Sequence, residues 1–235
     1  MRMMISKWTT LAMMGLAACA GSADAHSEKS AGASTAGTPA AIQAPLPAGA
    51  TRYNVASAGN AARFRVREQL MGHDLPNDAV GETQQITGFV TVDSKGALVP
   101  GQSKFVVQVT SLKSDSDRRD GYTQHRLLET DKYPTAVLVP TALRGLSSAS
   151  TSAGTSGPVT FDIIGDLTAH GVTRPTTWHV TAKQVDGRVT GSASTRFTFA
   201  DFAIDPPRVP VLLSVADTIG LEYDFTLTRD ASATP

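Results

Sequence analysis

The sequence contains one cysteine among 235 residues, so no disulfide bond can form within the chain. Aromatic side chains make up only 6% of the residues, which leaves few groups large enough to fill a wide interior. Basic and acidic side chains each number 21, and without residues 1–18 the numbers are 19 basic and 21 acidic. This balance provides no net positive charge for binding a nucleic acid or an anionic membrane surface. We therefore predict no nucleic-acid partner.

The sequence also lacks signatures of catalysis and of cofactor binding. It has no Gly-x-Ser-x-Gly elbow, no phosphate-binding glycine loop and no acidic pair in a recognisable pattern. A zinc site needs several nitrogen or sulfur ligands, and the five histidines show no such spacing: His26, His73, His125, His170 and His179. We predict no catalytic residue, no cofactor and no metal, the alternative being that distant histidines meet in space. We interpret His170 as a turn residue whose ring bonds nearby backbone.

The apolar stretch at residues 8–18 is too short to span a bilayer as a stable helix. Two basic residues precede it, and this order is typical of an export signal. Cys19 ends a Leu-Ala-Ala-Cys segment, which resembles the lipobox of bacterial lipoproteins. We therefore predict a lipoprotein signal peptide at residues 1–18 and a lipid anchor on Cys19 that attaches the chain to a membrane. The alternative is an ordinary secretory signal that is cleaved near residues 23–26.

Composition divides the remaining chain into a tether, one domain and a tail. Residues 19–50 are mostly Ala, Ser, Gly, Thr and Pro, which is typical of an unfolded tether. The globular domain is predicted at residues 51–230, and a short polar tail follows at 231–235. A Ser/Thr/Ala/Gly segment at residues 147–157 is predicted to be an exposed loop.

Alternating apolar and polar residues predict an all-β domain. Strands are expected around Phe64 and at residues 86–93, 104–109, 136–143, 159–168, 176–184, 188–199 and 219–228. His170-Gly171 is predicted to be a tight turn of an antiparallel hairpin, because glycine supplies the positive φ that such a turn needs. One short helix is expected near residues 117–130, with a cap at residues 114–116. Many antiparallel strands and one helix indicate a barrel or a sandwich.

An ordered set of short motifs resembles the YceI-like domain family over residues 53–227. The motifs are Phe64-Arg65-Val66-Arg67-Glu68, Ala79-Val80-Gly81-Glu82-Thr83, Ser111-Leu112-Lys113-Ser114-Asp115, Leu128-Glu129-Thr130, Tyr133-Pro134-Thr135-Ala136, Gly165-Asp166-Leu167-Thr168-Ala169-His170-Gly171, Asp201-Phe202-Ala203-Ile204 and Ser214-Val215-Ala216-Asp217. Ala203 departs from the pattern, because glycine is frequent there, and Leu138 stands where an aromatic residue is common. The resemblance implies an antiparallel, lipocalin-like barrel of about eight strands with the short helix near its mouth. It also implies an apolar lumen that holds a long hydrophobic molecule, and it allows homodimers.

Strand alternation assigns candidate residues to the lumen of this barrel. They are Phe64, Val66, Phe105, Val107, Phe161, Ile163, Trp178, Val180, Phe197, Leu221 and Phe225. For each of them the alternative to ligand contact is plain core packing. Arg118 and Arg119 are candidates for contacting a polar or phosphate head group. The alternative for this charged segment is a solvated helix start in which Asp and Arg pair locally.

These expectations together favour a non-catalytic binding protein of the cell envelope, in the periplasm or on the outer cell surface. Its expected ligand is a long-chain amphiphile: a polyisoprenoid, an isoprenoid quinone or a fatty-acid derivative. Two alternatives stay open, namely a structural or stress-response module with a filled lumen and a hydrolase that acts on a lipid.

Overall fold

The computed structural model describes residues 46–146 and 157–230, which are built mainly of antiparallel strands. The strands are β1 (Thr51–Val55), β2 (Ala61–Leu70), β3 (Asn77–Thr83), β4 (Ile86–Val92), β5 (Lys104–Gln108), β6 (Thr135–Arg144), β7 (Val159–Ala169), β8 (Val172–Val185), β9 (Arg188–Thr198) and β10 (Leu212–Arg229). The helix α1 (Asp117–Tyr122) continues into one π-helical turn, Thr123–Leu127, and short 3-10 turns occupy Val109–Ser111 and Phe199–Phe202.

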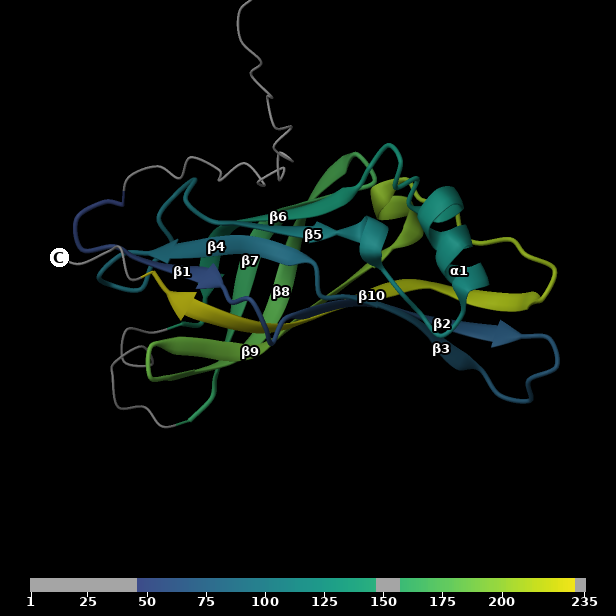
Figure 1. The fold of residues 1–235 in the computed structure, drawn as a ribbon, viewed down its shortest axis with the longest axis horizontal. Coiled ribbons are helices and arrows are strands. Elements are labelled where there is room, and N and C mark those ends of the chain that lie inside the picture. The colour runs from purple at the N-terminus through teal and green to yellow at the C-terminus, as the bar shows by residue number, and fades with distance from the viewer. Residues whose placement is uncertain (1–45, 147–156, 231–235) are drawn as a thin grey trace, which may run out of the picture. The chain divides into compact units, whose positions relative to one another are not determined.

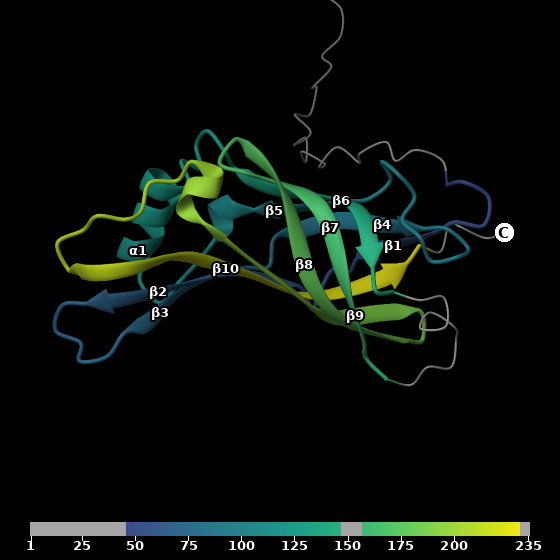
Figure 2. The ribbon, with the colours of Figure 1, turned by 180° about the vertical axis from the view of Figure 1, so that it is seen from behind.

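Eight strands close into a barrel in the order β1-β4-β5-β6-β7-β8-β9-β10, because β10 pairs back onto β1. β2 follows β1 along the same edge of β10, and β3 pairs with β2. β2, β3 and the first part of β10 therefore extend beyond the ring, next to α1 (Figure 1). Figure 2 shows the barrel from behind, where β7, β8 and β9 form the wall opposite β1, β4 and β5. The predicted barrel is confirmed, and the sandwich alternative is wrong.

The β7–β8 hairpin forms where the sequence predicts it. His170 and Gly171 both have positive φ, 49° and 74°, between the paired residues Ala169 and Val172. Such a two-residue turn matches the twist of the flanking strands. The His170 ring also bonds backbone as expected, because its Nδ1 donates to the carbonyl oxygen of Phe202 at 3.2 Å.

The short helix begins at the predicted cap. The hydroxyl of Ser116 accepts a hydrogen bond from the backbone N–H of Arg119, which satisfies one of the free N–H groups of the first turn. The helical segment ends at Leu127, close to the predicted end. Three strand segments were not predicted: β1, β3 and the part of β10 before Ile219. β1 is short, and the other two segments contain Gly, Asn, Asp and Ser residues that weaken the strand pattern.

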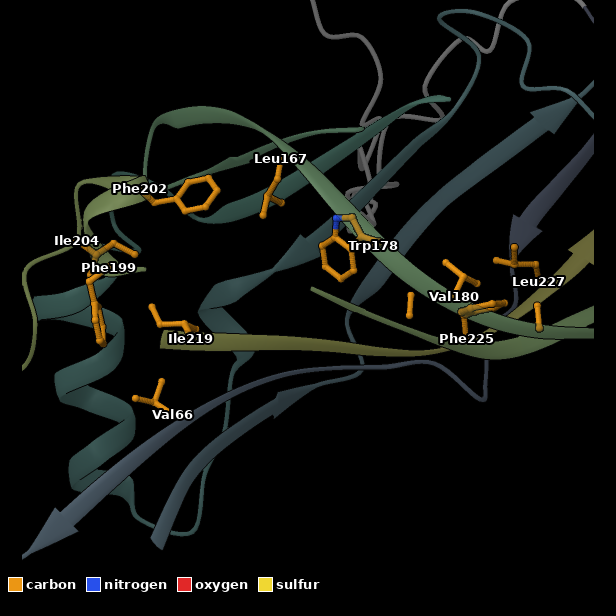
Figure 3. Close-up of a cluster of buried hydrophobic side chains, with 12 residues drawn as sticks. Val66, Leu167, Trp178, Val180, Phe199, Phe202, Ile204, Ile219, Phe225 and Leu227 are labelled. Atoms are coloured by element: carbon orange, nitrogen blue, oxygen red, sulfur yellow. The ribbon is translucent and has the colours of Figure 1, made fainter. Parts of the chain in front are cut away.

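The barrel end nearest α1 is filled by a buried apolar cluster. Phe202 is fully buried, and Phe199, Ile204, Ile219 and Val66 are each less than 9% exposed. In the view of Figure 3, Phe199 and Ile204 lie at the helix, and Trp178 and Val180 lie further along the barrel. Apolar burial of this kind contributes about 25 cal/mol per Å², so this cluster both stabilises the fold and closes that end.

Several predictions from the sequence lie outside the described residues. They are the signal peptide at residues 1–18, the anchor Cys19, most of the tether, most of the 147–157 loop and the tail at 231–235. Within the described residues, no helix combines the length and the apolar character needed to cross a membrane.

Candidate ligand-binding cavity

The barrel encloses a cavity of about 680 Å³, which lies within the usual range of about 300–1,000 Å³ for ligand pockets. Nine of the eleven predicted lumen residues line it: Phe64, Phe105, Val107, Phe161, Ile163, Trp178, Val180, Leu221 and Phe225. They face inward because successive side chains of a strand point to opposite faces. Small inward residues leave the space open, and they are Ala62, Ala136, Ala182 and Ala193.

Two predicted lumen residues do not line this cavity. Val66 is 8% exposed and belongs to the apolar cluster at the α1 end. Phe197 also packs against that cluster, with its ring 4.6 Å from the ring of Phe202 in an edge-to-face arrangement. For both residues the inward direction follows the strand alternation, but the turn at Phe199–Phe202 fills the space that they face.

The cavity opens at the end of the barrel opposite α1. Its exposed lining residues come from the β4–β5 turn and the β8–β9 hairpin, and they are Ser94, Lys183, Gln184, Asp186 and Gly187. The helix therefore lies at one barrel end, but it does not lie at this opening. The expected position of the helix near the mouth needs this correction, because the buried cluster of Phe199, Phe202 and Ile204 closes the end next to the helix.

A polar pair spans the opening. Gln184 Nε2 on β8 donates to Tyr53 Oη on β1 at 3.3 Å, and β9 and β10 separate these two strands in the ring. Arg229, the last residue of β10, is the cross-strand partner of Tyr53 and is exposed. Sequence reasoning missed all three residues. Only the inward alternation of Tyr53 and Gln184 could have indicated them, and it does not show which barrel end is open.

Inside the cavity, the hydroxyl of Tyr223 already has a hydrogen-bond partner within the protein. Its hydroxyl donates to Asn60 Oδ1 at 2.9 Å, and its ring lies edge-on to Phe105 at 6.2 Å. Burial raises the pKa of Tyr223 far above its ordinary value, so the phenol stays neutral. The interior therefore offers a long chain an apolar surface.

The two arginine candidates lie away from the cavity. Arg119 is engaged by carboxylates, since its Nη2 lies 3.0 Å from Glu68 Oε1 and its Nη1 pairs with Asp115. Arg118 is exposed on α1. Neither is a lining residue of the cavity. For Arg119 the structure shows the alternative interpretation, in which Arg pairs with a nearby Asp.

Among the residues that the structure describes, the cavity wall contains no histidine–carboxylate or cysteine–histidine pair. No histidine or cysteine lines it within residues 46–146 and 157–230, and no cluster of metal-ligating side chains forms in the same residues. The closest histidine–carboxylate contact, His179 Nδ1 to Asp162 Oδ1 at 2.7 Å, involves a largely exposed histidine that does not face the cavity.

Comparison with known proteins supports this description of the barrel. The model of the YceI-like domain matches residues 53–227, whereas no curated protein matches the chain. A polyisoprenoid binding domain from Saccharophagus degradans, implicated in plant cell wall breakdown, is 14% identical with a TM-score of 0.57, and the match covers 76% of this chain and 98% of that chain. BcnA from Burkholderia cenocepacia is 17% identical with a TM-score of 0.53, covering 71% of this chain and 95% of that chain.

At these identities the solved structures show a shared fold. The match covers almost the whole solved chain of the Saccharophagus degradans domain, so the shared fold extends over that entire domain. The described residues 46–146 and 157–230 all belong to one compact unit. Because the family model spans most of the sequence, from the first strand to the last, the chain belongs to the YceI-like domain family.

Proposed function

We propose that this protein is a non-catalytic carrier that holds the chain of a long amphiphilic lipid inside its barrel. The observation that carries the proposal is the cavity of about 680 Å³ with an apolar interior. Burying an apolar chain there contributes about 25 cal/mol per Å² before the costs of association. The similarity to a polyisoprenoid binding domain supports a polyisoprenoid, an isoprenoid quinone or a fatty-acid derivative as the ligand class.

The ligand enters with its chain first and leaves its polar group at the opening. The inner part of the cavity is lined by apolar side chains such as Leu167, Leu112 and Trp178, whereas Tyr53 and Gln184 offer hydrogen bonds at the opening. A buried polar group without a partner is costly, so the head group belongs with these two residues and with Arg229. This orientation assigns the head group to the barrel end opposite Arg118 and Arg119.

The protein acts outside the cytoplasm in this proposal, attached to a membrane through acylated Cys19. The Leu-Ala-Ala-Cys segment after a basic and apolar start supports this location. The Cys19→Ser variant is expected to move from the membrane pellet to the supernatant after ultracentrifugation. A Cys19→Ser variant that still sediments with the membrane contradicts the anchor. Light scattering of residues 42–235 checks the further expectation of a homodimer.

A cavity-filling variant tests the carrier function against the alternative of a dry structural lumen. Ala193 faces the cavity on β9, and Ser192 is its exposed neighbour on the opposite face. Ala193→Phe is expected to reduce the affinity for a fluorescent long-chain fatty acid at least about tenfold, because the ring takes space that the chain needs, whereas Ser192→Phe leaves it unchanged. In a filled core, Ala193→Phe instead destabilises the fold by about 1–3 kcal/mol through overpacking. Unchanged fatty-acid affinity in Ala193→Phe contradicts the carrier function.

A further inference from the structure

Four exposed cations lie at the opening of the cavity on the β4–β5 turn, the β8–β9 hairpin and the end of β10, and we call them the cationic rim: Lys95, Lys183, Arg188 and Arg229. Lys95 lies between the lining residues Ser94 and Gly96 in the β4–β5 turn. Lys183 itself lines the cavity, and Arg188 follows the lining residue Gly187 in the β8–β9 hairpin. The backbone N–H of Arg229 donates to the carbonyl oxygen of Gly187 at 3.3 Å, which places Arg229 at the same hairpin.

The side chains of the cationic rim form no ion pair with any residue in the described ranges. By contrast, the arginines on the outer face of β2 are neutralised, since Arg63 contacts Glu82 and Asp224, and Arg65 and Arg67 contact Asp78. Among the described carboxylates on the turns of the cationic rim, Asp186 is exposed, whereas Asp93 and Asp230 are half-buried. Asp93 Oδ1 also accepts the backbone N–H groups of Lys95 and Ala97. The open end therefore presents a local positive charge that the balanced total of the chain conceals.

An exposed apolar side chain lies among these cations. Val185 at the end of β8 is 57% exposed, between Lys183 and Arg188 in sequence. Apolar residues flanked by Lys or Arg are typical of segments that rest at a membrane interface, where the cations meet anionic head groups and the apolar group reaches the acyl boundary. Val185 and the cationic rim lie at the opening of an apolar cavity, so one face combines all three features.

We propose that the cationic rim docks the open end of the barrel onto an anionic lipid bilayer. In this orientation the opening faces the acyl layer, and a long-chain ligand passes between bilayer and cavity without crossing water. The inference rests on the proposed carrier function and adds the surface at which the ligand is exchanged. Electrostatic attraction of this kind is screened by salt, so docking weakens as ionic strength rises.

The opposite end of the molecule is the other candidate for membrane contact. It exposes Met71, Leu75, Val211 and Leu213 on the β2–β3 loop and at the start of β10. The loops at this end contain two acidic residues, Asp74 and Asp205, and one basic residue, Arg208. They therefore have no excess of positive charge with which to bind an anionic surface. Charge complementarity therefore favours the open end.

Sedimentation with vesicles tests the docking surface. Residues 42–235, which lack the predicted anchor, are mixed with vesicles of phosphatidylglycerol or of phosphatidylcholine. The Lys95→Gln/Arg188→Gln variant, which leaves every residue that lines the cavity unchanged, is compared with a matched control, Arg118→Gln/Arg126→Gln, which removes the same charge from exposed positions at the α1 end. Each rim cation is expected to contribute about fivefold to the affinity for anionic vesicles. The rim variant should thus bind about 25-fold more weakly, and the control should bind as the unaltered chain does.

Three outcomes overturn docking at the rim. They are equal binding of both variants to phosphatidylglycerol, equal binding of the unaltered chain to both lipids, and no binding to phosphatidylglycerol, which would favour an acidic protein partner. Measuring bound lipid by native mass spectrometry in the same preparations separates this inference from the carrier function. A rim variant that keeps its lipid but leaves the vesicles supports docking, whereas a chain that docks and never holds a lipid contradicts only the carrier function.

Discussion

The hydroxyl of Tyr223 in the cavity wall donates to the side-chain oxygen of Asn60 at 2.9 Å. The same oxygen accepts the backbone N–H of Thr226 at 3.0 Å, while Asn60 Nδ2 donates to the carbonyl oxygen of Ala56 at 2.8 Å. Asn60 thus takes the place of a strand peptide where β1 ends and β2 has not yet begun. This side chain keeps the edge of β10 bonded between the two strands.

Asn60→Ala is therefore expected to destabilise the barrel strongly. It leaves the Tyr223 hydroxyl and the Thr226 N–H without partners in a buried region, and each such loss costs about 1–3 kcal/mol. Urea denaturation should show a loss of about 2–4 kcal/mol in the free energy of unfolding. Tyr223→Phe removes the donor alone and should cost about 1 kcal/mol. A loss in Asn60→Ala no larger than that in Tyr223→Phe contradicts the role of Asn60 as a strand substitute.

The raised pKa of Tyr223 predicts that the stability of the fold decreases at high pH. Its ordinary pKa is 10.0, and burial raises the pKa in the folded state. Above pH 10 the unfolded chain releases the phenolic proton while the folded chain retains it, so the folded state binds more protons and stability falls as pH rises. Below pH 10 this contribution is fully present. Denaturation midpoints measured from pH 8 to pH 11 should decline less steeply for Tyr223→Phe than for the unaltered chain, and parallel declines would be evidence against this.

Ala203 offers a stabilising substitution. It follows the turn at Phe199–Phe202 with a φ of 52°, a left-handed conformation that disfavours a β-carbon. Ala203→Gly removes this strain and is expected to raise the free energy of unfolding by about 0.5–1 kcal/mol. Thermal denaturation measures the change. Ala200→Gly, at an exposed position with ordinary φ in the same turn, serves as a control and should destabilise.

The two arginines of α1 should differ in stability but not in lipid binding. Arg119 bonds Glu68, whose side chain is 10% exposed, so Arg119→Ala leaves that carboxylate poorly paired and should cost about 2 kcal/mol. Arg118→Ala, at an exposed position, should change stability by less than about 0.5 kcal/mol. Neither substitution is expected to alter the affinity for a long-chain lipid, as measured by displacement of a fluorescent fatty acid. A clear loss of affinity in a variant that carries both Arg118→Ala and Arg119→Ala would instead indicate that these arginines contact the head group.

The sequence predicts the features that depend on local pattern. The alternation of Phe161, Ile163 and Trp178 assigns their inward faces, and the His170-Gly171 turn follows from backbone preference alone. Features that depend on distant contacts were not predictable. The cluster around Phe202 decides which end is closed, and no local pattern shows that Phe197 faces this cluster.

The same limit applies to the polar residues of the site. Gln184 meets Tyr53 across the opening although 131 positions separate them in sequence, and Asn60 meets Tyr223 over 163 positions. A charge-rich segment such as that around Arg118 attracts attention in a sequence, whereas the cationic rim is assembled from separate turns. Its members become neighbours only when the barrel closes.

Native mass spectrometry of residues 42–235, produced in the organism's own cells and followed by organic extraction, tests the carrier function most directly. The cavity predicts one long-chain isoprenoid or lipid per barrel, and a strongly reduced content in Ala193→Phe but not in Ser192→Phe. A mass that corresponds to the protein alone, together with no uptake of such lipids on titration, would contradict the carrier function.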